Sequence, residues 1–105
     1  MHMKKVGVRE LEEKVRVGRP APLRVGATAY PESRADQYAK EKDERGKKKY
    51  SENATMYYAP TSNMKSAENR LLDICDNRGV CRRNVQMSSN MPASASRGYV
   101  YAIFP

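Results

Sequence analysis

The sequence predicts an α+β fold in which a small three-stranded sheet is flanked by helices. Three stretches have the alternation or the residue composition of strands, and three others place apolar side chains at helical spacing. A chain of 105 residues is long enough for one domain, so we expect residues 1–105 to form a single unit. The strand candidates are 23–27, 53–59 and 98–104, and the helix candidates are 4–17, 31–42 and 64–76.

The first element is an amphipathic helix within residues 1–18. Val8, Leu11 and Val15 share one face of it, and charged residues occupy the others. Gly18 is a natural stop for this helix.

A strand at 23–27 follows, because apolar residues alternate there with Arg24 and Gly26. The chain then turns and enters a second helix at Pro31, where the missing backbone N–H of proline would be unsatisfied in any case. We expect this helix to end near Lys42.

The second strand candidate, 53–59, is rich in Thr, Met and Tyr and is ended by Pro60. Tyr57 and Tyr58 are adjacent in it, so their side chains must point to opposite faces of the sheet.

The third helix candidate, 64–76, has N-cap candidates at 61–63 and a C-terminal glycine, Gly79. Glu68 lies beside its buried face, where a carboxylate needs a partner. That partner is either a basic side chain such as Arg34 or a divalent cation bound through oxygen. The apolar stripe of this helix consists of Met64, Ala67, Leu71, Ile74 and Cys75.

Residues 82–97 are polar and rich in serine, and they predict a long loop of the kind that is often functional. The chain closes with a strand at 98–104. Tyr99 and Tyr101 share one face of that strand, and Val100, Ala102 and Phe104 share the other. Because both faces carry apolar bulk, we expect a central strand.

The charge balance predicts a polyanionic partner. Lys and Arg number 20 against 12 Asp and Glu, which gives a net charge of +8. Phosphate contacts by such side chains release counterions and supply most non-specific affinity for nucleic acid. We therefore expect nucleic acid, DNA in particular, as the partner, although a charge run is also what an ordinary solvated surface looks like. The candidate contacts are Arg24, Lys42, Lys47, Lys48, Lys49, Arg82, Arg83 and Arg97.

No stretch approaches the roughly 20 apolar residues of a membrane span, so we expect no membrane association and an intracellular protein, nuclear or cytoplasmic. Cys75 and Cys81 are too few for a four-ligand zinc site, and we expect both to be reduced, the alternative being a small-loop disulfide in an exported protein.

The stretch 23–38 reads LRVGATAYPESRADQY. Its Gly26, Thr28, Pro31, Arg34 and Tyr38 are spaced so that the stretch resembles the second motif of the GIY-YIG nuclease family, roughly V-G-x-T-x-x-P-x-x-R-x-x-x-H/Y.

The resemblance implies a role for each matching residue. Arg34 would stabilise the scissile phosphate, and Tyr38 would help to polarise the attacking water. Glu68, in KSAENRLL, would hold one divalent metal ion, Mg²⁺ or Mn²⁺. Asn84 and Asn90 are equal candidates for the asparagine that family members place late in the chain.

The chain departs from the family pattern at Arg24, which stands where the second tyrosine would be, and nothing before it resembles G-I-Y. The C-terminal stretch 98–103, GYVYAI, does resemble that first motif. A circular permutation would restore the missing tyrosine at Tyr99 or Tyr101. It predicts that the C-terminal strand pairs with strand 23–27.

The leading functional prediction is a divalent-metal-dependent nuclease that cleaves phosphodiester bonds. Arg34, Tyr38 and a C-terminal tyrosine would act on the phosphate and the water, beside a metal on Glu68. The alternative is a catalytically inactive, basic nucleic-acid-binding module of the same fold. A third reading is a protein-interaction domain for an acidic partner.

Overall fold

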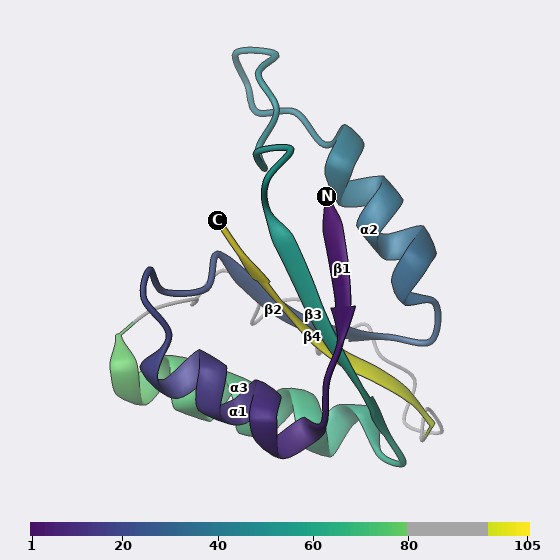
Figure 1. Ribbon diagram of the computed structural model, residues 1–105, viewed down its shortest axis with the longest axis vertical. Coiled ribbons are helices and arrows are strands. Elements are labelled where there is room, and N and C mark those ends of the chain that lie inside the picture. The colour runs from purple at the N-terminus through teal and green to yellow at the C-terminus, as the bar shows by residue number, and fades with distance from the viewer. Residues whose placement is uncertain (80–96) are drawn as a thin grey trace.

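The computed structural model describes residues 1–79 and 97–105, and in them four strands form one mixed sheet with three helices on its two faces (Figure 1). The α+β class is therefore confirmed, whereas the predicted number of three strands is wrong for these residues. The elements in chain order are β1 (His2–Lys5), α1 (Val8–Val17), β2 (Arg24–Thr28), α2 (Pro31–Lys40), β3 (Thr55–Thr61), α3 (Met64–Arg78) and β4 (Gly98–Phe104).

The strand order in the sheet is β1-β3-β4-β2. Strand β4 runs antiparallel to both of its neighbours, β2 and β3, and β1 runs parallel to β3. Two predictions are thereby confirmed: the C-terminal strand is central, and it pairs with the strand that contains Val25 and Ala27.

The fourth strand, β1, corrects the prediction of a helix from residue 4. Residues 2–5 pair with Thr55–Tyr58 instead, and the helix begins only at Val8. The backbone N–H of His2 donates to the carbonyl of Ala54 at 2.9 Å, so β1 satisfies backbone groups along the outer side of β3.

The two faces of the sheet carry separate cores. Helices α1 and α3 lie together on one face, and α2 lies on the other (Figure 1). Alternation along β4 divides its side chains between these faces, because successive residues of a strand point to opposite sides. Val100 and Ala102 pack toward α1 and α3, whereas Tyr101 and Ile103 pack toward α2.

The tyrosine pair in β3 follows the same rule. Tyr57 packs against the core beneath α1 and α3, and Tyr58 packs against the core beneath α2. Pro60, predicted to end this strand, lies inside it opposite Tyr99. It can do so because β1 pairs only as far as Tyr58, which leaves that side of β3 open.

The helix ends mostly follow the predicted signals. Pro31 is the first residue of α2, which ends at Lys40, two residues before the predicted end. The side chain of Asn63 accepts a hydrogen bond from the Ser66 N–H at 3.0 Å at the start of α3. Gly79 follows α3 in the left-handed conformation, with φ of 79°.

Most of the predicted loop 82–97 lies outside the described residues, as does Cys81, and only Arg97 of that loop is described. Cys75 is buried in α3. None of the helices in residues 1–79 and 97–105 is long and apolar enough to cross a membrane.

Candidate functional site

Two buried phenols meet on the α2 face of the sheet. Tyr38 comes from α2 and Tyr101 from β4, and their hydroxyl oxygens are 2.6 Å apart in a hydrogen bond. The exposed fractions of these residues are 1% and 0%. The ring of Tyr50 lies 5.7 Å from that of Tyr38, so three tyrosines from distant parts of the chain form one cluster.

Gly26 makes room for this cluster. It pairs with Tyr101 across the β2–β4 ladder, and a Cβ atom at position 26 would lie 2.5 Å from the Tyr101 hydroxyl oxygen. Real Cβ atoms do not approach other atoms so closely. The glycine of the V-G pair is therefore explained by the close approach of the Tyr101 ring.

Arg24 extends the cluster toward solvent. Its guanidinium carbon lies 4.5 Å from the centre of the Tyr38 ring, a cation–π geometry, and its Nη1 donates to the Tyr50 hydroxyl at 3.3 Å. Burial by itself would lower the pKa of Arg24. The hydrogen bond from Arg24 to Tyr50 and the neighbouring phenols outweigh that effect and raise the pKa, so the side chain stays charged.

The positive charge of Arg34 also affects the tyrosine cluster. Burial and the adjacent Tyr38 phenol raise the pKa of Tyr101, while the positive charges of Arg24 and Arg34 oppose that rise. The structure therefore brings Arg34, Tyr38 and Tyr101 to one face of the sheet. A phenol is protonated at neutral pH even at its ordinary pKa, and the raised pKa takes the Tyr101 phenol further from ionisation, so it is not a phenolate base there.

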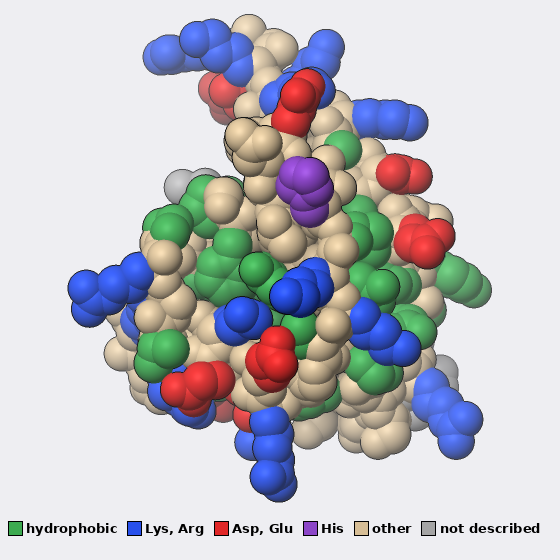
Figure 2. Space-filling model, in the orientation of Figure 1, with side chains coloured by type: hydrophobic (Ala, Val, Ile, Leu, Met, Phe, Trp, Pro, Cys, Tyr) green, Lys and Arg blue, Asp and Glu red, His purple; other side chains and the backbone are tan. Residues whose placement is uncertain are grey.

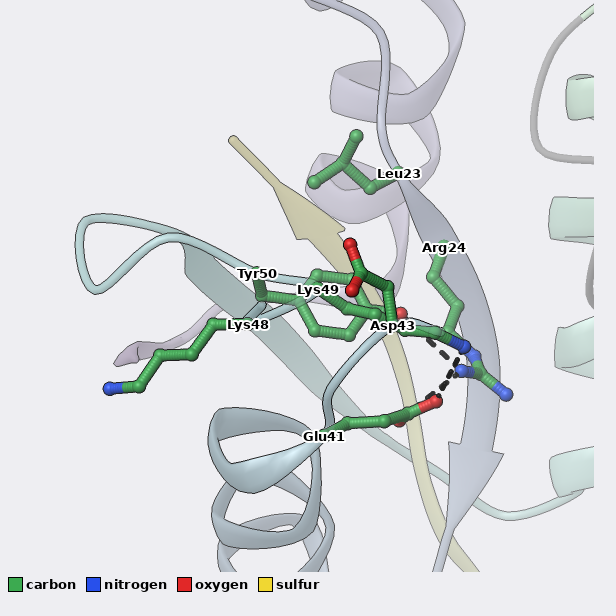
Figure 3. A pocket seen from close by; sticks show the side chains of 7 residues that line it. All are labelled: Leu23, Arg24, Glu41, Asp43, Lys48, Lys49 and Tyr50. Carbon is green, nitrogen blue, oxygen red and sulfur yellow. Dashed lines mark hydrogen bonds and ion pairs between the residues drawn. The ribbon is translucent and has the colours of Figure 1, made fainter. Parts of the chain in front are cut away.

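A cavity of about 460 Å³ opens beside this cluster, between β2 and the segment that follows α2 (Figure 3). Glu41 lies between two cations in it, 3.9 Å from Arg24 Nη1 and 3.0 Å from Lys49 Nζ. The cavity is lined by Leu23, Arg24, Glu41, Asp43, Lys48, Lys49 and Tyr50.

The basic segment, residues 40–49, is built around Asp43. One carboxylate oxygen of Asp43 accepts hydrogen bonds from the backbone N–H groups of Arg45 and Lys47, each at 2.9 Å. Gly46 has φ of 80°, which suits the tight turn. The backbones of Lys42 and Lys48 pair across the turn in an isolated antiparallel β-bridge. The segment is thus a small hairpin with exposed lysines, of which Lys49 pairs with Glu41.

Glu68 lies apart from the cluster. It projects from α3, which packs on the face of the sheet opposite to α2. Only 1% of its surface is exposed, and among the described residues neither carboxylate oxygen has a hydrogen-bond partner. Burial raises its pKa to about 7, although the nearby backbone N–H of Ala27 lowers it somewhat.

Two partners were predicted for Glu68, a basic side chain such as Arg34 and a divalent cation. Arg34 is on the α2 face, so the structure does not bring it to Glu68. A divalent ion needs six or more oxygen ligands, usually including water. Glu68 is closed off from water, and the described part of the chain holds no group of three His, Cys, Asp or Glu residues that could bind a metal ion. These residues alone do not complete a site for Mg²⁺ or Mn²⁺.

The other predicted site residues are scattered. Tyr99 lies at the end of the sheet, where its ring contacts Tyr58 with 5.7 Å between centroids, and it is not part of the cluster. Arg97 is exposed beside it. Arg82 and Arg83 lie outside the described residues, as do Asn84 and Asn90.

Tyr50 and Glu41, which both contact Arg24 in the site, were not predicted from the sequence as site residues. Tyr50 is an aromatic residue directly after the charged run, and Glu41 is an acid within it. The isolated position of Tyr50 could have drawn attention to it, because an aromatic residue at the end of a basic run has no role in a purely solvated loop. Glu41 had no such signal.

No family model, no curated protein and no solved structure matches this chain.

Proposed function

We propose that the protein binds nucleic acid by contacting the phosphate backbone with its basic hairpin, residues 40–49. Six of these ten residues are Lys or Arg and three are acidic. Figure 2 shows Lys and Arg side chains projecting from the tip of the molecule where this hairpin lies. Exposed cations on a protruding hairpin are suited to phosphate contacts, which need charge and reach rather than a deep site.

The burial of the tyrosine cluster supports binding over cleavage, and it is the observation on which the proposal depends. Tyr38 and Tyr101 are sealed from solvent and hydrogen bonded to each other. A group that activates water must come within hydrogen-bond reach of that water. In this arrangement the two phenols hold α2 against the sheet and position Arg24, whose charge adds to that of the hairpin.

A GIY-YIG-like nuclease is the second candidate, and one observation favours it. Arg34 and Tyr38, to which the resemblance assigns roles toward phosphate and water, come together from distant segments with Tyr101, one of the two tyrosines that a permutation would offer. Cleavage by such an enzyme would depend on Mg²⁺ or Mn²⁺ and on Arg34.

The test measures binding and cleavage with the same protein. Fluorescence anisotropy at 50 mM salt with EDTA would use labelled duplex DNA, single-stranded DNA and RNA. The same substrates, with plasmid added, would then be incubated with Mg²⁺ or Mn²⁺. We expect salt-sensitive binding and no cleavage. Absence of binding to every substrate would overturn the proposal.

The Arg34→Ala variant decides between the two candidates. Cleavage that EDTA abolishes and that Arg34→Ala also abolishes would establish the nuclease. Val17→Ala, at an exposed position of α1 on the opposite face, is the control for both measurements.

A further inference from the structure

A second surface lies at the opposite end of α2 from the basic hairpin, where the ends of all four strands meet. Three tyrosines and two cations surround it, and we call it the tyrosine trough. Two hollows form it, of about 330 and 520 Å³, and Tyr99 lines both. The residues that define the trough are Lys5, Tyr30, Tyr58, Arg97 and Tyr99.

The sheet topology brings these residues together. Lys5 pairs with Tyr58 at the end of β1, and Tyr99 at the start of β4 pairs with both Thr28 and Pro60. Tyr30 follows β2 directly. All four strand ends therefore meet at one end of the sheet, although they come from distant parts of the chain.

The tyrosines offer ring faces and edges to solvent. Tyr30 is 73% exposed, which is unusual for so large a side chain. Tyr58 and Tyr99 are half-buried and packed edge to face at 68°, so their rings are held in place. A fixed aromatic pair beside a freely exposed ring is a platform on which planar groups can stack.

The charges around the platform are mainly positive. Lys5 and Arg97 are exposed, one in each hollow. Glu32 also lines the smaller hollow, in the first turn of α2, and it disfavours a phosphate at the helix end itself. Phosphates are therefore expected beside Lys5 and Arg97 and not over the start of α2.

We propose that the tyrosine trough binds the bases of single-stranded nucleic acid. Exposed rings flanked by cations are the combination that single-strand-binding proteins use, since each base stacks on a ring while the backbone follows the charges. A duplex keeps its bases stacked internally and cannot use the rings in this way. The inference rests on the proposed function and adds to it a substrate class, the single strand.

Helix α2 connects the trough to the basic hairpin. Helix α2 begins beside the trough at Pro31 and ends at Lys40, where the hairpin starts. Its ten residues span about 15 Å. A single strand of twelve nucleotides, with roughly 3.4 Å between phosphates, is long enough to reach both surfaces.

The experiment uses a reporter that the chain lacks. The sequence contains no tryptophan, so Tyr30→Trp introduces a single one at the trough. We expect its fluorescence to be quenched by a twelve-nucleotide oligothymidine and not by an abasic strand with the same phosphates. Unchanged fluorescence with both strands, at concentrations where anisotropy shows that oligothymidine is bound, would overturn the inference.

Affinities of Tyr30 variants complete the test. Tyr30→Ala should bind oligothymidine about tenfold more weakly, whereas Tyr30→Phe should bind it as the native protein does. Neither variant should alter binding to duplex DNA or to the abasic strand. An equal loss for duplex and single strand would sink the inference while leaving the proposed function standing. If the native protein binds neither oligothymidine, the abasic strand nor duplex DNA at 50 mM salt, both the inference and the proposed function are wrong.

Discussion

Glu68 is a carboxyl group that the fold keeps from water. It sits in the α3 face of the core beside Ala27, with only 1% of its surface exposed. Charging a carboxyl group in such a place is costly without a compensating hydrogen bond, which is why burial raises its pKa from the ordinary 4.5 to about 7. The protonation of this one residue is thereby linked to the stability of the whole fold.

Stability should therefore fall as the pH rises from about 4.5 to about 7. Between these values the folded protein holds a proton on Glu68 that the unfolded chain has already lost, so each rise in pH favours the unfolded chain. The slope for one such proton is at most about 1.4 kcal/mol per pH unit. The loss is nearly complete about one unit above pH 7, and Glu68→Gln should be more stable than the native protein there.

Urea unfolding from pH 4 to pH 8 measures this effect for the native protein and for Glu68→Gln. Glu10→Gln, at an exposed position of α1, is the matched control. The free energies of unfolding of the native protein and Glu68→Gln should diverge with rising pH. Parallel curves for these two proteins would show that the carboxyl group is not linked to folding.

At the scale of the elements, the local signals at helix ends were accurate, whereas Pro60 did not end β3. Pro31 marks the start of α2, and Asn63 and Gly79 mark the two ends of α3, because caps act on backbone groups within one turn. Strand β1 had no such signal. The stretch HMKK has no alternating apolar pattern, and its strand conformation comes from pairing with β3, more than fifty residues away.

The α3 cap gives a direct test at this scale. Replacing Asn63 by Ala removes the oxygen that accepts from the Ser66 N–H and leaves that donor without its partner at the helix start. We expect the free energy of unfolding to fall by about 1 kcal/mol. Urea titration should show a lower midpoint at an unchanged slope. Ser62→Ala, at the exposed neighbouring position, is the control, and a loss of equal size there would rule out the cap as the cause.

At the scale of the whole molecule, the sheet determines which candidate residues can act together. The sequence places Arg34, Tyr38 and Glu68 on two helices but cannot say which face of the sheet each helix covers. In the structure α2 and α3 cover opposite faces, so the phenol cluster and the buried carboxylate are separated by the sheet. The pairing of β2 with β4, which the permutation predicted, is what carries Tyr101 to Tyr38.

Because the two faces of the sheet carry different side chains, we expect nucleic-acid binding to depend on where the positive charges lie more than on how many there are. Two triple variants each lower the net charge of +8 by three. The hairpin variant replaces Lys47, Lys48 and Lys49 by Gln. The helix variant replaces Arg9, Arg16 and Lys65 by Gln, at exposed positions of α1 and α3. Each phosphate contact on a single strand contributes about −0.7 to the slope of log K against log salt.

The slope should therefore be less negative by roughly 2 for the hairpin variant, whereas the helix variant should keep the native value. Anisotropy titrations of single-stranded DNA between 50 and 200 mM salt measure all three proteins. If both variants lose the same amount, binding responds to the total charge and the hairpin is not the contact surface. If only the hairpin variant changes, the nucleic acid lies on the α2 side of the sheet, because the two sets of lysines and arginines differ in their face and not in their number.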